Sequence, residues 1–498
     1  MALRRSISRL AMVYLVTLCL KTAFVSAFSS TNTPTTPTSS VQQRSANQQA
    51  LEDAPPFPRT WVPLASVYEL HPDRPTPLRF LGQSYVTYQS NDGQWAVFDD
   101  ACPHRLAPLS EGRVDRQKNR LECSYHGWEF DADGRCQEIP QADFSTMQKA
   151  MQNERCHVKS YPVHVEKNIL FVWPWADEDP LITVSQPHCA PEHFMEGVSE
   201  NCTTYTRDLP YGWDTLLENI VDPSHVPFAH HGLQGKREDA IPINMTSPSD
   251  LSPEGFVFQF EDRTMSMRRQ GGAVFRAPFV IHYKADFETP SKEKQKKRAN
   301  SPKVFNLTAI MLPTKPGWSR IILMGAPRTK QIEKKEKERL VAKIFRKLPS
   351  WLVHTFSNRF LDSDLAFLHF QEQERERRGV DARAYFMPAQ SDRCVSALRK
   401  WILQYAHIPG PLPAPLTDRG VLFNRWTQHG EHCRHCTSAR KRVAKWRTNT
   451  LRLLAISLVL AKFTAARVVA ALSLLLLNRL SAVDKAFSDG GFSHYDNH

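Results

Sequence analysis

Two short half-motifs, each holding one cysteine and one histidine, constrain this chain more than any other feature. They are Cys102-Pro103-His104 and Cys123-Ser124-Tyr125-His126, with 18 residues between the two halves. Each half supplies one thiolate and one imidazole from a tight loop, and both groups bind transition metals. The spacing therefore predicts a metal centre whose ligands are divided equally between two loops.

The pattern indicates a Rieske [2Fe–2S] cluster with Cys102, His104, Cys123 and His126 as ligands. In such a cluster two cysteines hold one iron and two histidines hold the other. The alternative is a zinc site, which also accepts two cysteines and two histidines. Zinc motifs of that type usually pair Cys with Cys and His with His, so the mixed halves favour the cluster. The motif and its flanks resemble the Rieske domain of the ring-hydroxylating oxygenase superfamily.

Residues 57–175, which surround the motif, are expected to form a small antiparallel β domain. Tyr85–Tyr88 and Trp95–Phe98 flank Asn91-Asp92-Gly93, a sequence that favours a tight turn between paired strands.

A second metal site is predicted further along the chain, because a Rieske cluster only transfers electrons. The apolar spacing of Trp213, Leu216, Leu217 and Ile220 predicts a helix that ends before Pro223. The pattern Asp222-x-x-His225-x-x-x-x-His230 follows, and it resembles the mononuclear iron site of Rieske oxygenases. Two histidines and one carboxylate on one face of Fe(II) leave positions open for O₂ and substrate. His231 competes with His230, and the alternative is a set of hydrogen-bonding loop histidines.

The carboxylate ligand of this second site is predicted to be Asp364. Residues Asn358–Arg378 are expected to form a helix with Phe360, Leu361, Leu365 and Leu368 on one side. Asp364 lies within that apolar arc, whereas Asp362 points about 160° away and is expected to be exposed. A carboxylate on an apolar face is costly unless it is paired or bound to metal. The alternative is that Asp364 pairs with a nearby arginine.

Longer stretches resemble the plastid and cyanobacterial oxygenases of the pheophorbide a oxygenase group. They are Cys102–Arg113, Glu218–His230, and Cys433-Arg434-His435-Cys436 followed by an apolar tail. The likeness covers roughly residues 57–480 and is loose over residues 240–350. It implies an α+β fold: a Rieske β domain, a catalytic domain (200–430) whose antiparallel sheet grips a long helix, and membrane-associated C-terminal helices. A basic insertion, Ser291–Lys303, is expected to be a solvated loop.

This resemblance implies an enzyme that oxygenates a chlorophyll-derived tetrapyrrole, with a ferredoxin-type electron donor. In the family, electrons pass from the cluster of one subunit to the mononuclear iron of its neighbour. An aspartate before the first ligand histidine hydrogen-bonds a cluster histidine across that interface. Asp222 occupies the matching position, so the resemblance implies a catalytic role for Asp222 and a ring-shaped homotrimer.

Three other activities remain open. One is a chlorophyllide a oxygenase-like reaction, and one is a redox-sensing Rieske component of the plastid inner-envelope import machinery. The third is sterol modification, which becomes attractive if the N-terminal segment is an ER signal only.

The segment 431–450 contains Cys433 and Cys436. The way the family uses this Cys-x-x-Cys motif implies that the two cysteines form a redox dithiol. Two unreactive thiols are an alternative. His429, His432 and His435 lie close in sequence and also allow a zinc site.

Nucleic-acid binding by the globular body is not supported, although the formal net charge is +13. The excess positive charge lies in residues 1–50 and 432–483, and the residues between them are neutral overall.

The N-terminus is typical of a targeting sequence. Arg4, Arg5 and Arg9 precede the apolar stretch Leu10–Leu20, and Val25-Ser26-Ala27 offers a cleavage site, so residues 1–27 are predicted to be a signal peptide. The Ser/Thr-rich segment 28–50 has the composition of a disordered transit peptide. Together they resemble the bipartite presequences of algae with complex plastids; an ordinary secreted protein is the alternative.

The C-terminal segment 451–480 is predicted to be a hydrophobic membrane anchor. Lys462 and Arg467 interrupt it, so either a helical hairpin in one leaflet or a tilted span with snorkelling cations fits the sequence. A buried amphipathic helix pair is the alternative. The basic residues before it suit an anionic membrane surface of the plastid envelope or thylakoid.

Overall fold

The computed structural model describes residues 57–175, 189–200, 202–288, 304–327, 348–380, 384–406, 418–489 and 491–493. The predicted signal peptide (1–27), transit segment (28–50) and basic insertion (291–303) lie outside these ranges.

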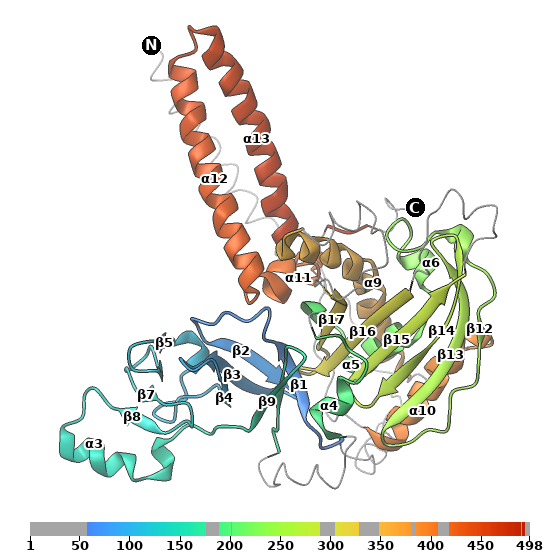
Figure 1. Ribbon diagram of the computed structural model, residues 1–498, viewed down its shortest axis with the longest axis horizontal. Helices are drawn as coiled ribbons and strands as arrows, with labels where there is room; N and C mark the ends of the chain where they lie inside the picture. Colours follow the sequence, from blue (N-terminus) through green and yellow to red (C-terminus); the bar gives the residue numbers. More distant parts are fainter. Residues whose placement is uncertain are drawn as a thin grey trace, which may run out of the picture. The chain divides into compact units, whose positions relative to one another are not determined.

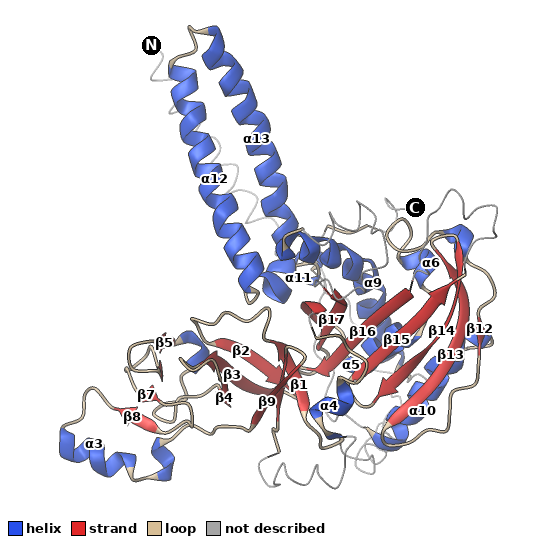
Figure 2. Cartoon of the chain, viewed as in Figure 1, coloured by secondary structure: helices blue, strands red, loops and turns tan. Residues whose placement is uncertain are grey.

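The N-terminal part of the described chain is an antiparallel β domain (Figures 1 and 2). Its sheets have the strand orders β1-β10-β9, β2-β3-β4 and β5-β6-β7-β8. The strands are β1 Val62–Ser66, β2 Thr76–Phe80, β3 Gln83–Gln89, β4 Trp95–Asp99, β5 Arg113–Asp115, β6 Arg120–Glu122, β7 Glu129–Phe130, β8 Cys136–Glu138, β9 Val163–Glu166 and β10 Ile169–Val172. One helix, α3 (Phe144–Met151), follows β8.

The turn predicted at Asn91-Asp92-Gly93 is confirmed. Strands β3 and β4 pair antiparallel with Gln89 opposite Trp95. Gly93 has φ +86°, a left-handed conformation that residues with a side chain rarely adopt.

The second part of the chain contains a seven-stranded antiparallel sheet of order β11-β17-β16-β15-β14-β13-β12. Its strands are β11 Cys202–Leu209, β12 Asn244–Met245, β13 Gly255–Thr264, β14 Met267–Arg276, β15 Val280–Phe287, β16 Val304–Pro313 and β17 Ser319–Pro327. Strand β13 shows why one face is buried: Phe256, Phe258 and Phe260 point into the core, and the residues between them are exposed.

Helices α5 (Trp213–Val221), α9 (Ser350–Arg378) and α10 (Arg393–Tyr405) pack against this sheet. The short helices of this part of the chain are α4 (Pro191–Phe194), α6 (Val226–Ala229) and α11 (Arg419–Leu422). Leu361, Leu365 and Leu368 of α9 share one apolar core with the sheet strands. The sheet therefore holds the long helix, and the predicted α+β architecture is confirmed (Figure 2).

The long helix begins eight residues before the predicted start at Asn358. Pro349 precedes it as the N-cap, and Gly379 ends it in a left-handed conformation. The additional first turns carry His354, which the sequence analysis did not identify.

Two long antiparallel helices, α12 (Arg434–Val459) and α13 (Thr464–Ser488), form a hairpin near the C-terminal end of the described chain (Figure 1). Asp484 of α13 pairs with Arg440 and Arg447 of α12.

Large apolar side chains are exposed around the turn of this hairpin, so the alternative of a buried amphipathic helix pair does not hold. These residues, the hairpin tip, are Leu451, Leu453, Ile456, Leu458, Val459, Leu460, Phe463, Val468, Leu472, Leu474, Leu475 and Leu476. Helix α13 is long and apolar enough to cross a membrane.

Candidate metal centres

The two Cys/His loops have the same backbone conformation. In each loop the cysteine N–H donates to the carbonyl five residues later, from Cys102 to Ala107 at 2.8 Å and from Cys123 to Trp128 at 2.9 Å. The residue four positions after each cysteine returns a hydrogen bond to the cysteine carbonyl and has a positive φ, +58° at Leu106 and +74° at Gly127. The loops are thus two copies of one ligand-bearing turn.

The cysteines of these loops are buried and the histidines lie nearer the surface. Cys102 and Cys123 are each 1% exposed, and burial raises the pKa of Cys102 to about 12. The rings of His104 and His126 lie 4.5 Å apart, and His104 stacks on Trp128. His104 Nδ1 is buried and has no hydrogen-bond partner among the described residues. Two adjacent thiols and an imidazole nitrogen without a partner fit a Rieske cluster.

The second centre begins where α5 ends. Asp222 caps the last turn of α5, and its Oδ1 accepts the N–H of Ser224 at 2.7 Å. Its Oδ2 lies 3.4 Å from Nδ1 of His225. The short helix α6 then brings His230 back beside His225, with 5.1 Å between the ring centroids.

Asp364 reaches the same point from α9. Its Oδ2 lies 3.3 Å from Nε2 of His230, and the ligand atoms of His225, His230 and Asp364 all lie within 4.8 Å of one another. His231 is not part of this group, and its Nδ1 accepts the N–H of Arg237 at 3.2 Å. The three residues named from the sequence thus converge, in a donor set suited to non-heme Fe(II).

Two neighbours that the sequence analysis missed orient His230. Nδ1–H of His230 donates to Ser363 Oγ at 2.7 Å, and Ser363 Oγ donates to the carbonyl of Phe360 at 2.6 Å. The Phe360 ring stacks on the imidazole at 3.9 Å. These contacts leave the Nε2 lone pair facing Asp364, as metal-binding histidines require. The only sign of these two residues in the sequence was their closeness to Asp364, which lies within four positions of both.

Burial also sets the protonation of this centre. It lowers the pKa of His230 to about 2, so the imidazole is neutral and able to bind metal. Burial raises the pKa of Asp364 to about 6, because the carboxylate loses water and the charge of nearby His225 offsets only part of that cost.

The prediction that Asp362 is exposed is wrong. Asp362 is fully buried, with Oδ1 2.7 Å from Nη2 of Arg207 and Oδ2 2.8 Å from Nε of Arg425. The error arose because α9 is covered on more than one side. The arginine pairing considered for Asp364 belongs to Asp362.

Cys433 and Cys436 lie together at the start of α12 with both side chains buried. Burial raises the pKa of Cys433 to about 11. His429 and His354 adjoin them, whereas His432 is partly exposed beside Glu431 and His435 bonds the carbonyl of Tyr68.

Comparisons with known proteins agree with this arrangement. Residues 60–162 match the family described as Rieske [2Fe-2S] domain, and residues 275–381 match the family described as Pheophorbide a oxygenase. Pheophorbide a oxygenase, chloroplastic, from Arabidopsis thaliana is 33% identical over 401 residues, which cover 76% of this chain and 72% of that protein. Flavonoid 8-hydroxylase 2, chloroplastic, from Ocimum basilicum is 32% identical over 474 residues, covering 89% and 86%.

A solved structure supports the fold. The crystal structure of dicamba monooxygenase bound to dicamba superposes with a TM-score of 0.51 over 69% of this chain and 96% of that chain, at 17% identity. From the matching families, the relatives that match over most of their length and the two centres, we conclude that this chain belongs to the pheophorbide a oxygenase family of Rieske-type oxygenases, oxidoreductases that use a [2Fe–2S] cluster and a mononuclear iron.

Proposed function

We propose that this chain oxygenates a chlorophyll-derived tetrapyrrole, using O₂ and electrons from a ferredoxin-type donor. The observation that carries the proposal is the convergence of His225, His230 and Asp364 in a chain that also presents the paired Cys/His loops. Similarity to Arabidopsis pheophorbide a oxygenase over three quarters of the chain supports the substrate class.

In this proposal Cys102, His104, Cys123 and His126 hold the cluster, and His225, His230 and Asp364 hold the mononuclear iron. When bound, the cluster supplies single electrons and the iron activates O₂. The protein fixes the ligand orientations: Asp222 contacts Nδ1 of His225, and Ser363 accepts the Nδ1 proton of His230. Burial of His230 and Asp364 excludes bulk water from this centre.

We also propose a homotrimer in which Asp222 links the two centres of neighbouring subunits. Asp222 already contacts His225 and keeps a quarter of its side chain exposed. Beside the cluster histidines, Leu106 is 75% exposed and Tyr125 63% exposed, and exposed apolar groups of this kind suit a protein interface.

A cavity of about 590 Å³ adjoins the loop that joins Asp222 to His230, and it supports substrate access there. Pro223, Val226 and Phe228 line it together with the charged residues Asp262 and Arg263. Its size is within the usual range for small-molecule sites, about 300–1,000 Å³.

The second candidate function is hydroxylation of a flavonoid-type phenol. The observation that favours it is the similarity to the Ocimum flavonoid 8-hydroxylase, which covers 89% of this chain.

We propose that the protein acts in a plastid, attached to the envelope or thylakoid membrane, and that the plastid is the complex plastid of an alga. The relatives described above are chloroplastic. The exposed apolar residues of the hairpin tip support insertion into lipid.

Incorporation of labelled O₂ tests the function. The full chain, reduced by ferredoxin, would be given pheophorbide a, chlorophyllide a, protochlorophyllide a or a flavone under ¹⁸O₂, with mass spectrometry of the products. We expect label in one tetrapyrrole, and none with His225→Ala, whose Rieske spectrum should persist. Label only in the flavone would favour the second candidate. No label from a preparation with about three irons per chain would contradict both.

A further inference from the structure

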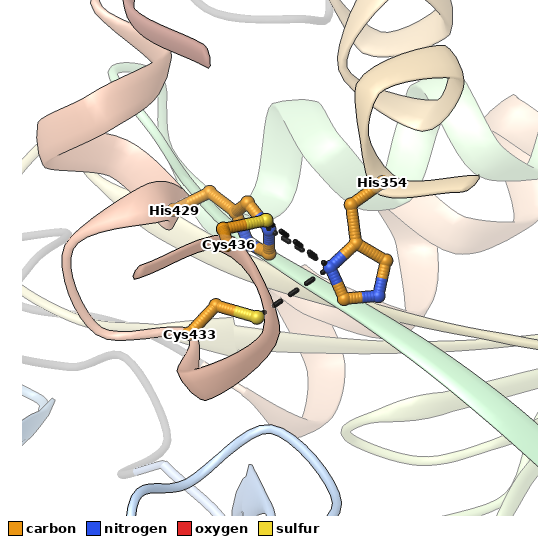
Figure 3. Close-up of side chains that lie close together, drawn as sticks. All are labelled: His354, His429, Cys433 and Cys436. Atoms are coloured by element: carbon orange, nitrogen blue, oxygen red, sulfur yellow. Dashed lines mark hydrogen bonds between the residues drawn. The ribbon is translucent and has the colours of Figure 1, made fainter. Parts of the chain in front are cut away.

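Four buried side chains outside the two iron centres converge on one point (Figure 3). His354 comes from the first turns of α9, His429 from a π-helical turn at Trp426–Gly430, and Cys433 and Cys436 from the start of α12. All four are at most 4% exposed. Segments about 75 residues apart in sequence thus bring two imidazoles and two thiols together.

The separations between the converging atoms are those of a tetrahedral metal site. His354 Nδ1 lies 3.1 Å from His429 Nε2, 3.5 Å from Cys433 Sγ and 3.6 Å from Cys436 Sγ. His429 Nε2 lies 3.3 Å from Cys436 Sγ. With Zn–N near 2.05 Å and Zn–S near 2.3 Å, a tetrahedron has N–N edges of about 3.3 Å and N–S edges of about 3.5 Å.

The outward nitrogens of both histidines are held by backbone carbonyls of β11. His354 Nε2 donates to the carbonyl of Thr204 at 3.1 Å, and His429 Nδ1 donates to that of Thr206 at 2.5 Å. In the neutral rings, these bonds leave both inward nitrogens as lone pairs facing each other. A carbonyl behind each ligand histidine is the usual support in a protein metal site.

A proton is the alternative to a metal at the centre of the cluster. One imidazole could be cationic and pair with a thiolate, or with Glu69, whose Oε2 lies 3.8 Å from His429 Nδ1. A single proton joins two atoms, however, whereas four ligand atoms meet here. A divalent cation satisfies all four and offsets the charge of two thiolates.

We propose that His354, His429, Cys433 and Cys436 bind a structural Zn²⁺ ion. Two sulfurs and two nitrogens in a tetrahedron select zinc among common divalent metals. Four protein ligands close the coordination sphere, which is typical of a structural site. A redox dithiol fits less well, because Cys433 and Cys436 are 2% and 1% exposed and a partner thiol has little access to either sulfur.

The zinc ion connects the start of α12, at the base of the α12–α13 hairpin, with α9, the helix that carries Asp364. His354 and the iron ligand Asp364 lie ten positions apart on α9, about 15 Å along the helix axis. Arg434, between the two cysteines, also donates its backbone N–H to the carbonyl of Glu69 at 2.9 Å. The site therefore fastens α12 to α9 and β11.

Metal analysis of the full-length protein in detergent tests the proposal. We expect about one zinc per chain beside the irons, and zinc X-ray absorption should report two sulfur and two nitrogen neighbours. Cys436→Ser should lose most of the zinc and keep its iron. The matched control is His435→Gln, which changes a histidine between the two cysteines that bonds the carbonyl of Tyr68 and is not one of the four converging residues, and it should keep the zinc.

Three results would overturn the proposal. They are iron-loaded wild-type protein without zinc, Cys436→Ser with undiminished zinc, and a Cys433–Cys436 disulfide found by mass spectrometry in the purified protein. If Cys436→Ser does not fold, the wild type still decides the matter. Modification of its thiols with an organomercurial should release one zinc in step with two cysteines, and release of none would contradict the site.

Discussion

Asp362 and Asp364 lie two residues apart on α9, and both are buried, but their carboxylates have different partners. Asp362 lies between Arg207 and Arg425, whereas Asp364 faces His230 at 3.3 Å. One turn of this helix therefore carries both a carboxylate in a structural ion pair and a carboxylate placed to bind a metal.

Replacing Asp364 with alanine should remove the mononuclear iron and leave the cluster. The carboxylate faces His225 and His230 and forms no ion pair with an arginine among the described residues, so its loss should cost little folding energy. Iron content should fall by about one third, with an unchanged Rieske electron-paramagnetic signal. Retention of the third iron would show that Asp364 is not a ligand.

Replacing Asp362 with alanine should instead destabilise the protein. The change leaves Arg207 buried, with Nε and Nη2 still bonded to Gln428 but its charge uncompensated. Breaking a buried pair in this way costs about 3–5 kcal/mol. We expect a clear fall in the thermal unfolding temperature, while any folded fraction keeps its full iron content. Asp362→Ala as stable as Asp364→Ala would contradict this assignment.

These two aspartates also show what the sequence could and could not reveal. The Cys/His spacing, the Asp-x-x-His-x-x-x-x-His pattern and the apolar arc around Asp364 are local, so their residues could be named. The surroundings of Asp362 could not, because Arg207 and Arg425 lie far away in sequence. His354 was missed for the same reason: its partners His429, Cys433 and Cys436 come from another segment, and the predicted helix began after it.

Asp222→Asn should slow electron transfer while preserving both metal centres. The amide keeps the shape of the carboxylate but loses the charge beside His225 Nδ1. In single-turnover mixing with O₂, the reduced cluster should reoxidise at least tenfold more slowly than in the wild type, at equal iron content. Ser224→Ala, which removes a neighbouring hydroxyl that donates to Asp222, is the control and should have a smaller effect. Equal rates in Asp222→Asn and wild type would remove Asp222 from the electron path.

The hairpin tip should govern membrane attachment. Leu458 and Leu475 are 58% and 63% exposed on α12 and α13. Charged groups in hydrocarbon cost about 2.5–3.5 kcal/mol each, so Leu458→Glu with Leu475→Glu should weaken vesicle binding more than tenfold. The control is Leu403→Glu, a comparably exposed leucine on α10. Co-sedimentation with anionic vesicles measures the effect, and equal binding by both variants would argue against insertion of the tip.

Glu372 should make the stability of the catalytic domain depend on pH. Burial, together with nearby Asp214, raises its pKa to about 7, although its Oε1 accepts the N–H of Gly212 at 2.7 Å and Arg375 lies 3.8 Å away. The pKa is about 4.5 when the chain is unfolded, so the folded state binds the proton more tightly. The contribution of Glu372 to the free energy of unfolding is therefore fully present below pH 4.5, is lost as the pH rises towards 7, and does not change further above that range.

Glu372→Gln should remove this loss, because the amide oxygen still accepts from Gly212 and carries no charge. We expect the difference in free energy of unfolding between the variant and the wild type to be roughly 1–3 kcal/mol more favourable to the variant at pH 8 than at pH 5. Glu374→Gln is the control on the same helix. Arg377 and Arg378 lower the pKa of Glu374 to about 2, so its replacement should give no gain at pH 8. Thermal unfolding at both pH values measures the difference, and the same shift in both variants would mean that burial of Glu372 is not its cause.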